Sequence, residues 1–124
     1  MPRVNLIEGP VGTGKSTFAL ALALKTDGVH IALDEWFSTL FSPDRPAGDF
    51  VPWYIERKER LLGLIWIHSR RILASGRNVI LELGLIQHKG RIEFCRKVLD
   101  GGFELEVYVL DAPREVRRDR KSHV

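Results

Sequence analysis

Residues 9–17 read Gly9-Pro10-Val11-Gly12-Thr13-Gly14-Lys15-Ser16-Thr17, which matches the pattern G-x-x-x-x-G-K-S/T at every fixed position. Glycines let the backbone turn so tightly that successive N–H groups point inward, where they can bind phosphate oxygens. A helix that begins at the end of such a turn adds free N–H groups and the positive end of its dipole. The segment therefore predicts a loop that binds the phosphates of a nucleotide.

The side chains of this loop suit different parts of a magnesium nucleotide. Lys15 is expected to reach the β- and γ-phosphates, the Ser16 hydroxyl to bind Mg²⁺, and Thr17 to donate to the α-phosphate. Backbone contacts with the phosphates are expected from Gly9, Val11, Gly12, Thr13 and Gly14. The alternative, a glycine-rich turn that caps a helix, is disfavoured because four fixed positions seldom match by chance when glycine averages only about 7% of residues in proteins. The pattern leaves ATP and GTP equally open.

Apolar periodicity and glycine or proline breaks predict alternating strands and helices on both sides of this loop. Strands are expected at Val4–Glu8, Val29–Leu33, Asn78–Leu83 and Phe103–Leu110. Helices are expected at Ser16–Lys25, Asp34–Phe41, Trp53–Ser75, Gly90–Asp100 and from Pro113 onward, with a loop at Ser42–Pro52. Such alternation favours right-handed crossovers and a parallel sheet covered on both faces, so we expect a three-layer α/β domain.

The composition bounds the class of protein. A chain of 124 residues that is 44% hydrophobic and 28% charged suits one folded domain, spanning 1–124. Cys95 is the only cysteine, which excludes an intrachain disulfide and a cysteine-rich zinc site; its apolar helical stripe predicts a buried thiol. No apolar run is long enough to cross a bilayer and the first residues do not resemble a signal peptide, so we expect a soluble, cytoplasmic protein without membrane contacts.

The net charge of +3 arises entirely from residues 114–124, where five basic residues outnumber two acidic ones. The remaining residues, 1–113, therefore balance to zero. This basic segment is either a solvated helix face or a site for anions, including nucleic acid.

Acidic residues stand at or near the ends of three predicted strands. In a parallel α/β sheet, ligands bind beyond the carboxyl ends of the strands, which places Asp34 and Glu82 near the phosphates. A carboxylate there can accept a proton from an attacking hydroxyl or hold Mg²⁺. Asp111 also ends a strand, but its position before Pro113 favours the N-cap of a following helix.

Three segments in order resemble the P-loop kinase group, which includes zeta toxins, chloramphenicol phosphotransferases, polynucleotide 5′-kinases and bacterial proteins called AAA-family ATPases. They are the glycine-rich loop, Leu33-Asp34-Glu35-Trp36-Phe37, and the stretch from Val107 to Val116. The resemblance implies a P-loop NTPase fold with strand order 2-3-1-4 and the cofactors ATP and Mg²⁺. It also implies transfer of the γ-phosphoryl group to a hydroxyl, with Asp34 as general base and Arg120 as a lid residue that contacts the nucleotide.

Some positions depart from the group's pattern. Phe37 stands where polynucleotide kinases often carry Arg, which disfavours that activity. Glu82 stands where Asp is usual, so its expected role as a metal ligand beside Ser16 and Asp34 is open. Arg91 resembles an arginine on the acceptor side or the phosphate side, and a surface arginine is an equal alternative.

The chain ends where similar proteins continue through a lid and a fifth strand. The resemblance therefore implies a C-terminally incomplete domain whose fourth strand is an unpaired edge. Because unpaired edges attract other strands, we predict either self-association through this edge or its coverage by the last helix.

Three functions remain open. The leading hypothesis is an ATP-dependent phosphotransferase that acts on a small-molecule or nucleotide-type hydroxyl acceptor, with catalysis by Lys15, Asp34 and Arg120. The second is an ATP-binding or ATPase module without an acceptor. The third is a nucleic-acid 5′-end kinase or binder that uses the basic segment.

Overall fold

The computed structural model describes residues 2–10, 12–85, 88–112 and 115–119. Its strands are β1 (Arg3–Glu8), β2 (Val29–Ala32), β3 (Val79–Glu82), β4 (Glu104–Ala112) and β5 (Glu115–Asp119). Its helices are α1 (Lys15–Thr26), α2 (Leu33–Leu40), α3 (Phe50–Ala74) and α4 (His88–Asp100), with a short 3₁₀ helix at Ser42–Asp44. None of the helices in these ranges is both long and apolar enough to cross a membrane.

The strands form one sheet in the order β2-β3-β1-β4-β5. The first four are parallel, which confirms the predicted parallel order 2-3-1-4. β1 lies between β3 and β4, with Leu6 opposite Leu81 on one side and Val107 on the other. The central position of β1 carries the glycine-rich loop that follows it to the middle of one edge of the sheet.

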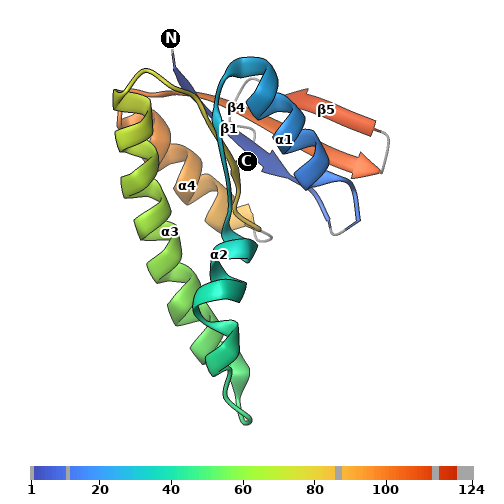
Figure 1. The fold of residues 1–124 in the computed structure, drawn as a ribbon, viewed down its shortest axis with the longest axis vertical. Helices are drawn as coiled ribbons and strands as arrows, with labels where there is room; N and C mark the ends of the chain where they lie inside the picture. The colour runs from blue at the N-terminus through green and yellow to red at the C-terminus, as the bar shows by residue number, and fades with distance from the viewer. Residues whose placement is uncertain (1, 11, 86–87, 113–114, 120–124) are drawn as a thin grey trace.

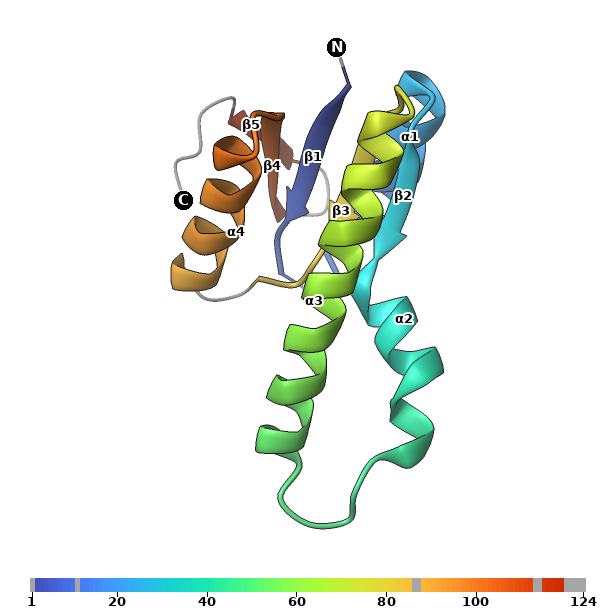
Figure 2. The same cartoon turned by 90° about the vertical axis from the view of Figure 1, so that its left-hand side faces the viewer.

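Helices cover both faces of the sheet, so the three-layer prediction is confirmed (Figures 1 and 2). Side chains alternate along a strand, and Ile7 packs under α1 in one apolar cluster with Ala19 and Ala23. Val4 and Leu6 pack into a larger cluster on the other face, which α2, α3 and α4 cover. The sheet is therefore buried on both sides, as the continuous apolar strands predict.

α2 and the first half of α3 extend beyond the carboxyl ends of the parallel strands (Figure 2). Aromatic rings hold the two helices together, with Phe37 centred 5.7 Å from Trp53 and 5.0 Å from Tyr54. α3 begins at Phe50 rather than at Trp53, because a proline in the first turn, here Pro52, loses no helical hydrogen bond. The side chains of α2 and α3 therefore lie beyond the edge of the sheet that carries the glycine-rich loop.

The prediction of a helix from Pro113 onward is wrong. Residues 115–119 form β5, which pairs with β4 in the antiparallel direction. The outer backbone groups of β4 gain partners within the chain through this pairing, which a helix would not provide. Asp111 consequently lies inside β4 and is not a helix N-cap, and the predicted self-association through an unpaired fourth strand loses its basis.

Candidate functional site

The loop between β1 and α1 depends on glycines held in left-handed backbone conformations. Gly9 has φ 148°, Gly12 has φ 85° and Gly14 has φ 82°. A Cβ atom on Gly9 would lie 2.5 Å from the carbonyl oxygen of Leu110, so only glycine fits there. Thr13 closes the loop by donating a 2.7 Å hydrogen bond to the carbonyl oxygen of Pro10. Of the residues expected to contact phosphates, Val11 lies outside the described residues.

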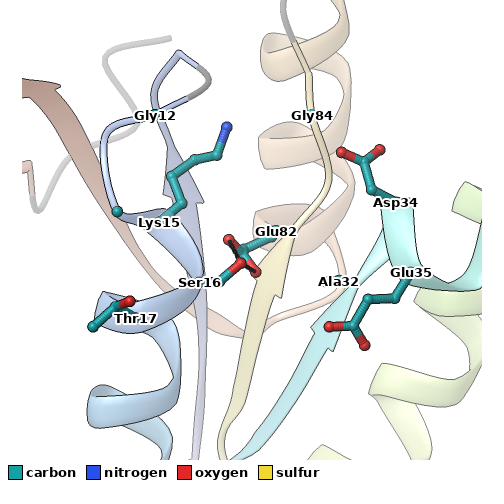
Figure 3. A pocket seen from close by; sticks show the side chains of 10 residues that line it. Gly12, Lys15, Ser16, Thr17, Ala32, Asp34, Glu35, Glu82 and Gly84 are labelled. Carbon is teal, nitrogen blue, oxygen red and sulfur yellow. Dashed lines mark hydrogen bonds between the residues drawn. The ribbon is translucent and has the colours of Figure 1, made fainter. Parts of the chain in front are cut away.

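Lys15 is the first residue of α1, and its side chain turns back across the loop. Its ammonium group donates a 2.6 Å hydrogen bond to the carbonyl oxygen of Gly9. Ser16 and Thr17 follow in the first turn of α1, where the helix leaves N–H groups without helical partners. The Lys15 and Ser16 side chains and the helix N-terminus thus face the same region, whereas Thr17 lies on the other side of the first turn (Figure 3).

Ser16, Glu82 and His30 form a hydrogen-bonded chain across three elements of the fold. The Ser16 hydroxyl lies 3.2 Å from each carboxylate oxygen of Glu82, at the end of β3. Oε2 of Glu82 lies 2.7 Å from Nε2 of His30 on β2; Glu82 is buried and His30 is largely buried. The structure therefore brings together Ser16 and Glu82, two of the three predicted metal ligands. The partnership of His30 with Glu82 is one that the sequence analysis missed.

A cavity of about 320 Å³ lies above these residues and contains most of the predicted site. Asp34 lines it from the first turn of α2, directly after the end of β2, and faces Lys15 across the cavity (Figure 3). Its lining residues are Gly12, Gly14, Lys15, Ser16, Thr17, Ala32, Asp34, Glu35, Glu82 and Gly84.

The oxygen donors of this cavity suit Mg²⁺, which usually binds one or two carboxylates together with water and substrate phosphates. Ser16 supplies a hydroxyl and Glu82 and Asp34 supply carboxylates, so the donor set fits the ion. Among the described residues, no group of three or more His, Cys, Asp or Glu side chains is arranged to hold a metal by itself. The fit is therefore to a metal held jointly with phosphates rather than by the protein alone.

A second cavity, of about 540 Å³, adjoins the first on the side of α3 and α4. Lys15, Asp34 and Gly84 line both cavities. The residues that line only the second are Glu8, Gly9, Pro10, Tyr54, Lys58, Leu85, Arg91 and Val109. Arg91, which the sequence left between a site residue and a surface residue, thus lies in the site.

The pKa values of three titratable groups that line the second cavity are shifted from their ordinary values. Burial raises the pKa of Glu8 to about 7, although the charges of Arg91, Lys15 and Lys58 oppose the shift. Burial lowers the pKa of Lys58, against the opposing effects of Asp34 and Glu8. The Lys58 ammonium donates a 2.6 Å hydrogen bond to the carbonyl oxygen of Gly84. Burial also raises the pKa of Tyr54, and the negative charge of Asp34 adds to that shift.

Glu8, Lys58 and Tyr54 line the larger cavity but are not among the predicted site residues. Glu8 gave one usable signal, because it is a charged residue in an otherwise apolar strand and directly precedes the glycine-rich loop. Lys58 and Tyr54 gave none, since they lie within the charged and aromatic part of a long helix. Arg120, the expected lid residue, lies outside the described residues.

Comparisons with known proteins agree with this geometry. A family model described as an AAA domain matches residues 4–123, which is nearly the whole chain. Among solved structures, the chain is similar to the APS kinase CysC of Mycobacterium tuberculosis, determined as a cysteine-to-alanine mutant. The TM-score is 0.59 at 20% sequence identity, and the match covers 98% of this chain and 83% of that chain. At this identity the likeness concerns the fold, which is that of a P-loop NTPase. No curated protein matches the chain significantly.

Proposed function

We propose that this chain, which belongs to the AAA domain family of P-loop kinase-like proteins, binds ATP with Mg²⁺. It then transfers the γ-phosphoryl group of ATP to a hydroxyl of a small-molecule or nucleotide-type acceptor. One observation carries the proposal: Lys15 and Asp34 line both cavities. A transferred phosphoryl group must pass from the nucleotide to the acceptor, and these two side chains stand where the two cavities meet.

The loop and its helix supply the nucleotide side of the reaction. Backbone N–H groups of Gly12 to Ser16 bind the phosphate oxygens, and the Lys15 ammonium exchanges the carbonyl oxygen of Gly9 for the β- and γ-phosphates. Ser16 and Glu82 would hold Mg²⁺, which would neutralise phosphate charge, and this leaves the Asp34 carboxylate free to act on the acceptor. His30 keeps the Glu82 carboxylate oriented through their 2.7 Å contact.

Asp34 is the residue that acts on the acceptor. Its carboxylate accepts the proton of the acceptor hydroxyl while that oxygen forms a bond to the γ-phosphorus. The bond between the γ-phosphorus and the β–γ bridging oxygen breaks, and ADP leaves with the electron pair. Lys15 stabilises the negative charge that develops on the oxygens around the γ-phosphorus.

The test compares Asp34→Asn with the control variant Glu35→Gln. Glu35 is the next residue in the chain and lines only the smaller cavity. Transfer from γ-labelled ATP to a panel of hydroxyl metabolites is expected to fall about 10²- to 10⁴-fold in Asp34→Asn, the range for loss of a general base. Calorimetry is expected to show ATP·Mg²⁺ affinity within about threefold of the wild type, since the phosphate-binding residues are intact. GTP is titrated in parallel.

Two results contradict the proposal. Unchanged transfer in Asp34→Asn rules out Asp34 as the base. Label released only as inorganic phosphate, whatever hydroxyl compound is present, indicates an ATPase module without an acceptor.

A further inference from the structure

Two buried polar atoms of the larger cavity have no hydrogen-bond partner within the described part of the chain. They are Oε1 of Glu8 and Nε of Arg91. Glu8 is only 6% exposed. Buried polar atoms are nearly always paired, and leaving one unpaired costs about 1 to 3 kcal/mol. Both residues line the same cavity, which makes a ligand in that cavity the natural partner for both atoms.

The hydrogen-bonding capacity of the two atoms restricts the ligand. Nε of Arg91 only donates, so its partner must be an acceptor such as an anionic oxygen. Oε1 of Glu8 pairs with a hydroxyl in either protonation state. Lys58 adds a second cation to the cavity and has three N–H donors, one of which binds the carbonyl oxygen of Gly84.

The charges of the cavity favour an anion. Lys15 is engaged with the nucleotide in the proposed function, which leaves Lys58 and Arg91 as the cations and Asp34 and Glu8 as the acids. With Glu8 protonated, two positive charges face one negative charge. A cavity of about 540 Å³ also falls in the usual size range for small-molecule sites.

We propose that this cavity binds the acceptor through an anionic group held by Lys58 and Arg91, with Glu8 hydrogen-bonded to an acceptor hydroxyl. The acceptor is thus an alcohol that carries a phosphate, a sulfate or a carboxylate. The inference rests on the proposed function, because it assigns the second cavity to the acceptor of that same reaction.

The titration of Glu8 supplies an independent readout. Its pKa of about 7 reflects burial, opposed by Arg91 on α4, Lys15 on α1 and Lys58 on α3. Cys95 on α4, Asp34 on α2 and Tyr54 on α3 are also coupled to this network. An anion bound between Lys58 and Arg91 favours the protonated form of Glu8. Anion affinity should therefore fall as the pH rises through about 7.

The experiment is calorimetry on the full chain saturated with a non-hydrolysable ATP analogue and Mg²⁺, so that the glycine-rich loop is occupied. The probes are ribose 5-phosphate, glycerol 3-phosphate and glycerate, each compared with ribose or glycerol as its neutral counterpart. At least one anionic probe is expected to bind roughly tenfold or more tightly than its counterpart, about 1.4 kcal/mol.

Variants locate the binding. Lys58→Met and Arg91→Met should each weaken that probe roughly tenfold or more, whereas Lys97→Met, an exposed lysine of α4, should leave it unchanged. In Glu8→Gln, the decline in affinity from about pH 6 to about pH 8 should be absent. This comparison between two proteins at the same pH also cancels any titration of the probe, and circular dichroism verifies that each variant is folded.

The outcomes separate the two proposals. If the analogue binds but no anionic probe binds more tightly than its neutral counterpart, this inference is overturned and the proposed function stands. An equal loss in Lys97→Met and Lys58→Met also overturns it, because the effect is then one of overall charge. If the analogue itself does not bind, the proposed function fails and this inference fails with it.

Discussion

The two adjoining cavities differ in how their polar groups are satisfied. At the smaller one, Glu82 binds both Ser16 and His30, and Lys15 binds a carbonyl oxygen of its own loop. In the larger one, buried atoms of Glu8 and Arg91 lack partners among the described residues. A side chain held by the protein is oriented in advance, whereas an unpaired buried one raises the energy of the fold and gains the most from a ligand.

Removal of the Lys15 ammonium should have a large effect on nucleotide binding in the smaller cavity. Lys15→Ala is expected to weaken ATP·Mg²⁺ roughly 10- to 100-fold, because charge-assisted hydrogen bonds contribute about 1.5 to 3 kcal/mol. Calorimetry measures the loss, with Lys25→Ala, an exposed lysine of the same helix, as the control. An unaltered affinity would show that the loop does not bind the nucleotide in the proposed way.

Glu8→Gln should have an effect of similar size, on the pH dependence of stability. The pKa of Glu8 is about 7 in the folded chain, against 4.5 for an ordinary carboxyl group. The folded state therefore holds this proton more tightly than the unfolded state. The stabilisation is complete below about pH 4.5 and is lost as the pH rises through about 7.

Because glutamine does not ionise, Glu8→Gln should gain about 2 to 3 kcal/mol over the wild type between about pH 4.5 and pH 8. Urea denaturation at several pH values measures the difference. Glu59→Gln, an exposed site on α3, should show no such trend. Parallel curves for the wild type and Glu8→Gln would mean that burial does not raise this pKa, which would remove the contrast between the cavities.

His30→Phe should lower stability by about 1 to 2 kcal/mol, because Glu82 loses its 2.7 Å contact while remaining buried. The same variant should reduce the Mg²⁺ dependence of nucleotide binding, since Glu82 is then less well oriented. Denaturation and calorimetry measure the two effects, and His68→Phe, an exposed histidine of α3, is the control. Equal stability of His30→Phe and the wild type would argue that the chain from Ser16 to His30 contributes nothing to the fold.

The smallest effect is expected at Cys95, which is 1% exposed. Burial raises the pKa of its thiol to about 11, and the charge of Glu8 adds to the shift. The thiol should resist alkylation near pH 8 until the chain is denatured. Cys95→Ala should cost about 1 kcal/mol and leave nucleotide binding unchanged. Rapid alkylation of the folded chain would place the thiol outside the core.

Local patterns predicted what depends on short stretches of the chain. The glycines of the loop occupy left-handed conformations that the motif implies, and the continuous apolar centre of β3 predicted a strand buried on both faces. The prediction of a helix after Ala112 was wrong because Pro113 and the charged residues that follow it suit the first turn of a helix as well as a hairpin. Pairing with the outer side of β4 decided between them, and no local signal encodes that partner.

The sequence by itself determined the phosphate-binding loop, the alternation of strands and helices, and the candidacy of Lys15, Ser16, Asp34 and Glu82, because backbone freedom and apolar periodicity are properties of neighbouring residues. Only the tertiary structure decided that His30 binds Glu82 and that Glu8, Lys58 and Arg91 meet in one cavity. Those three residues come from β1, α3 and α4, far apart in the chain. Their chemistry arises from burial and mutual charge, which exist only after the helices pack on the sheet.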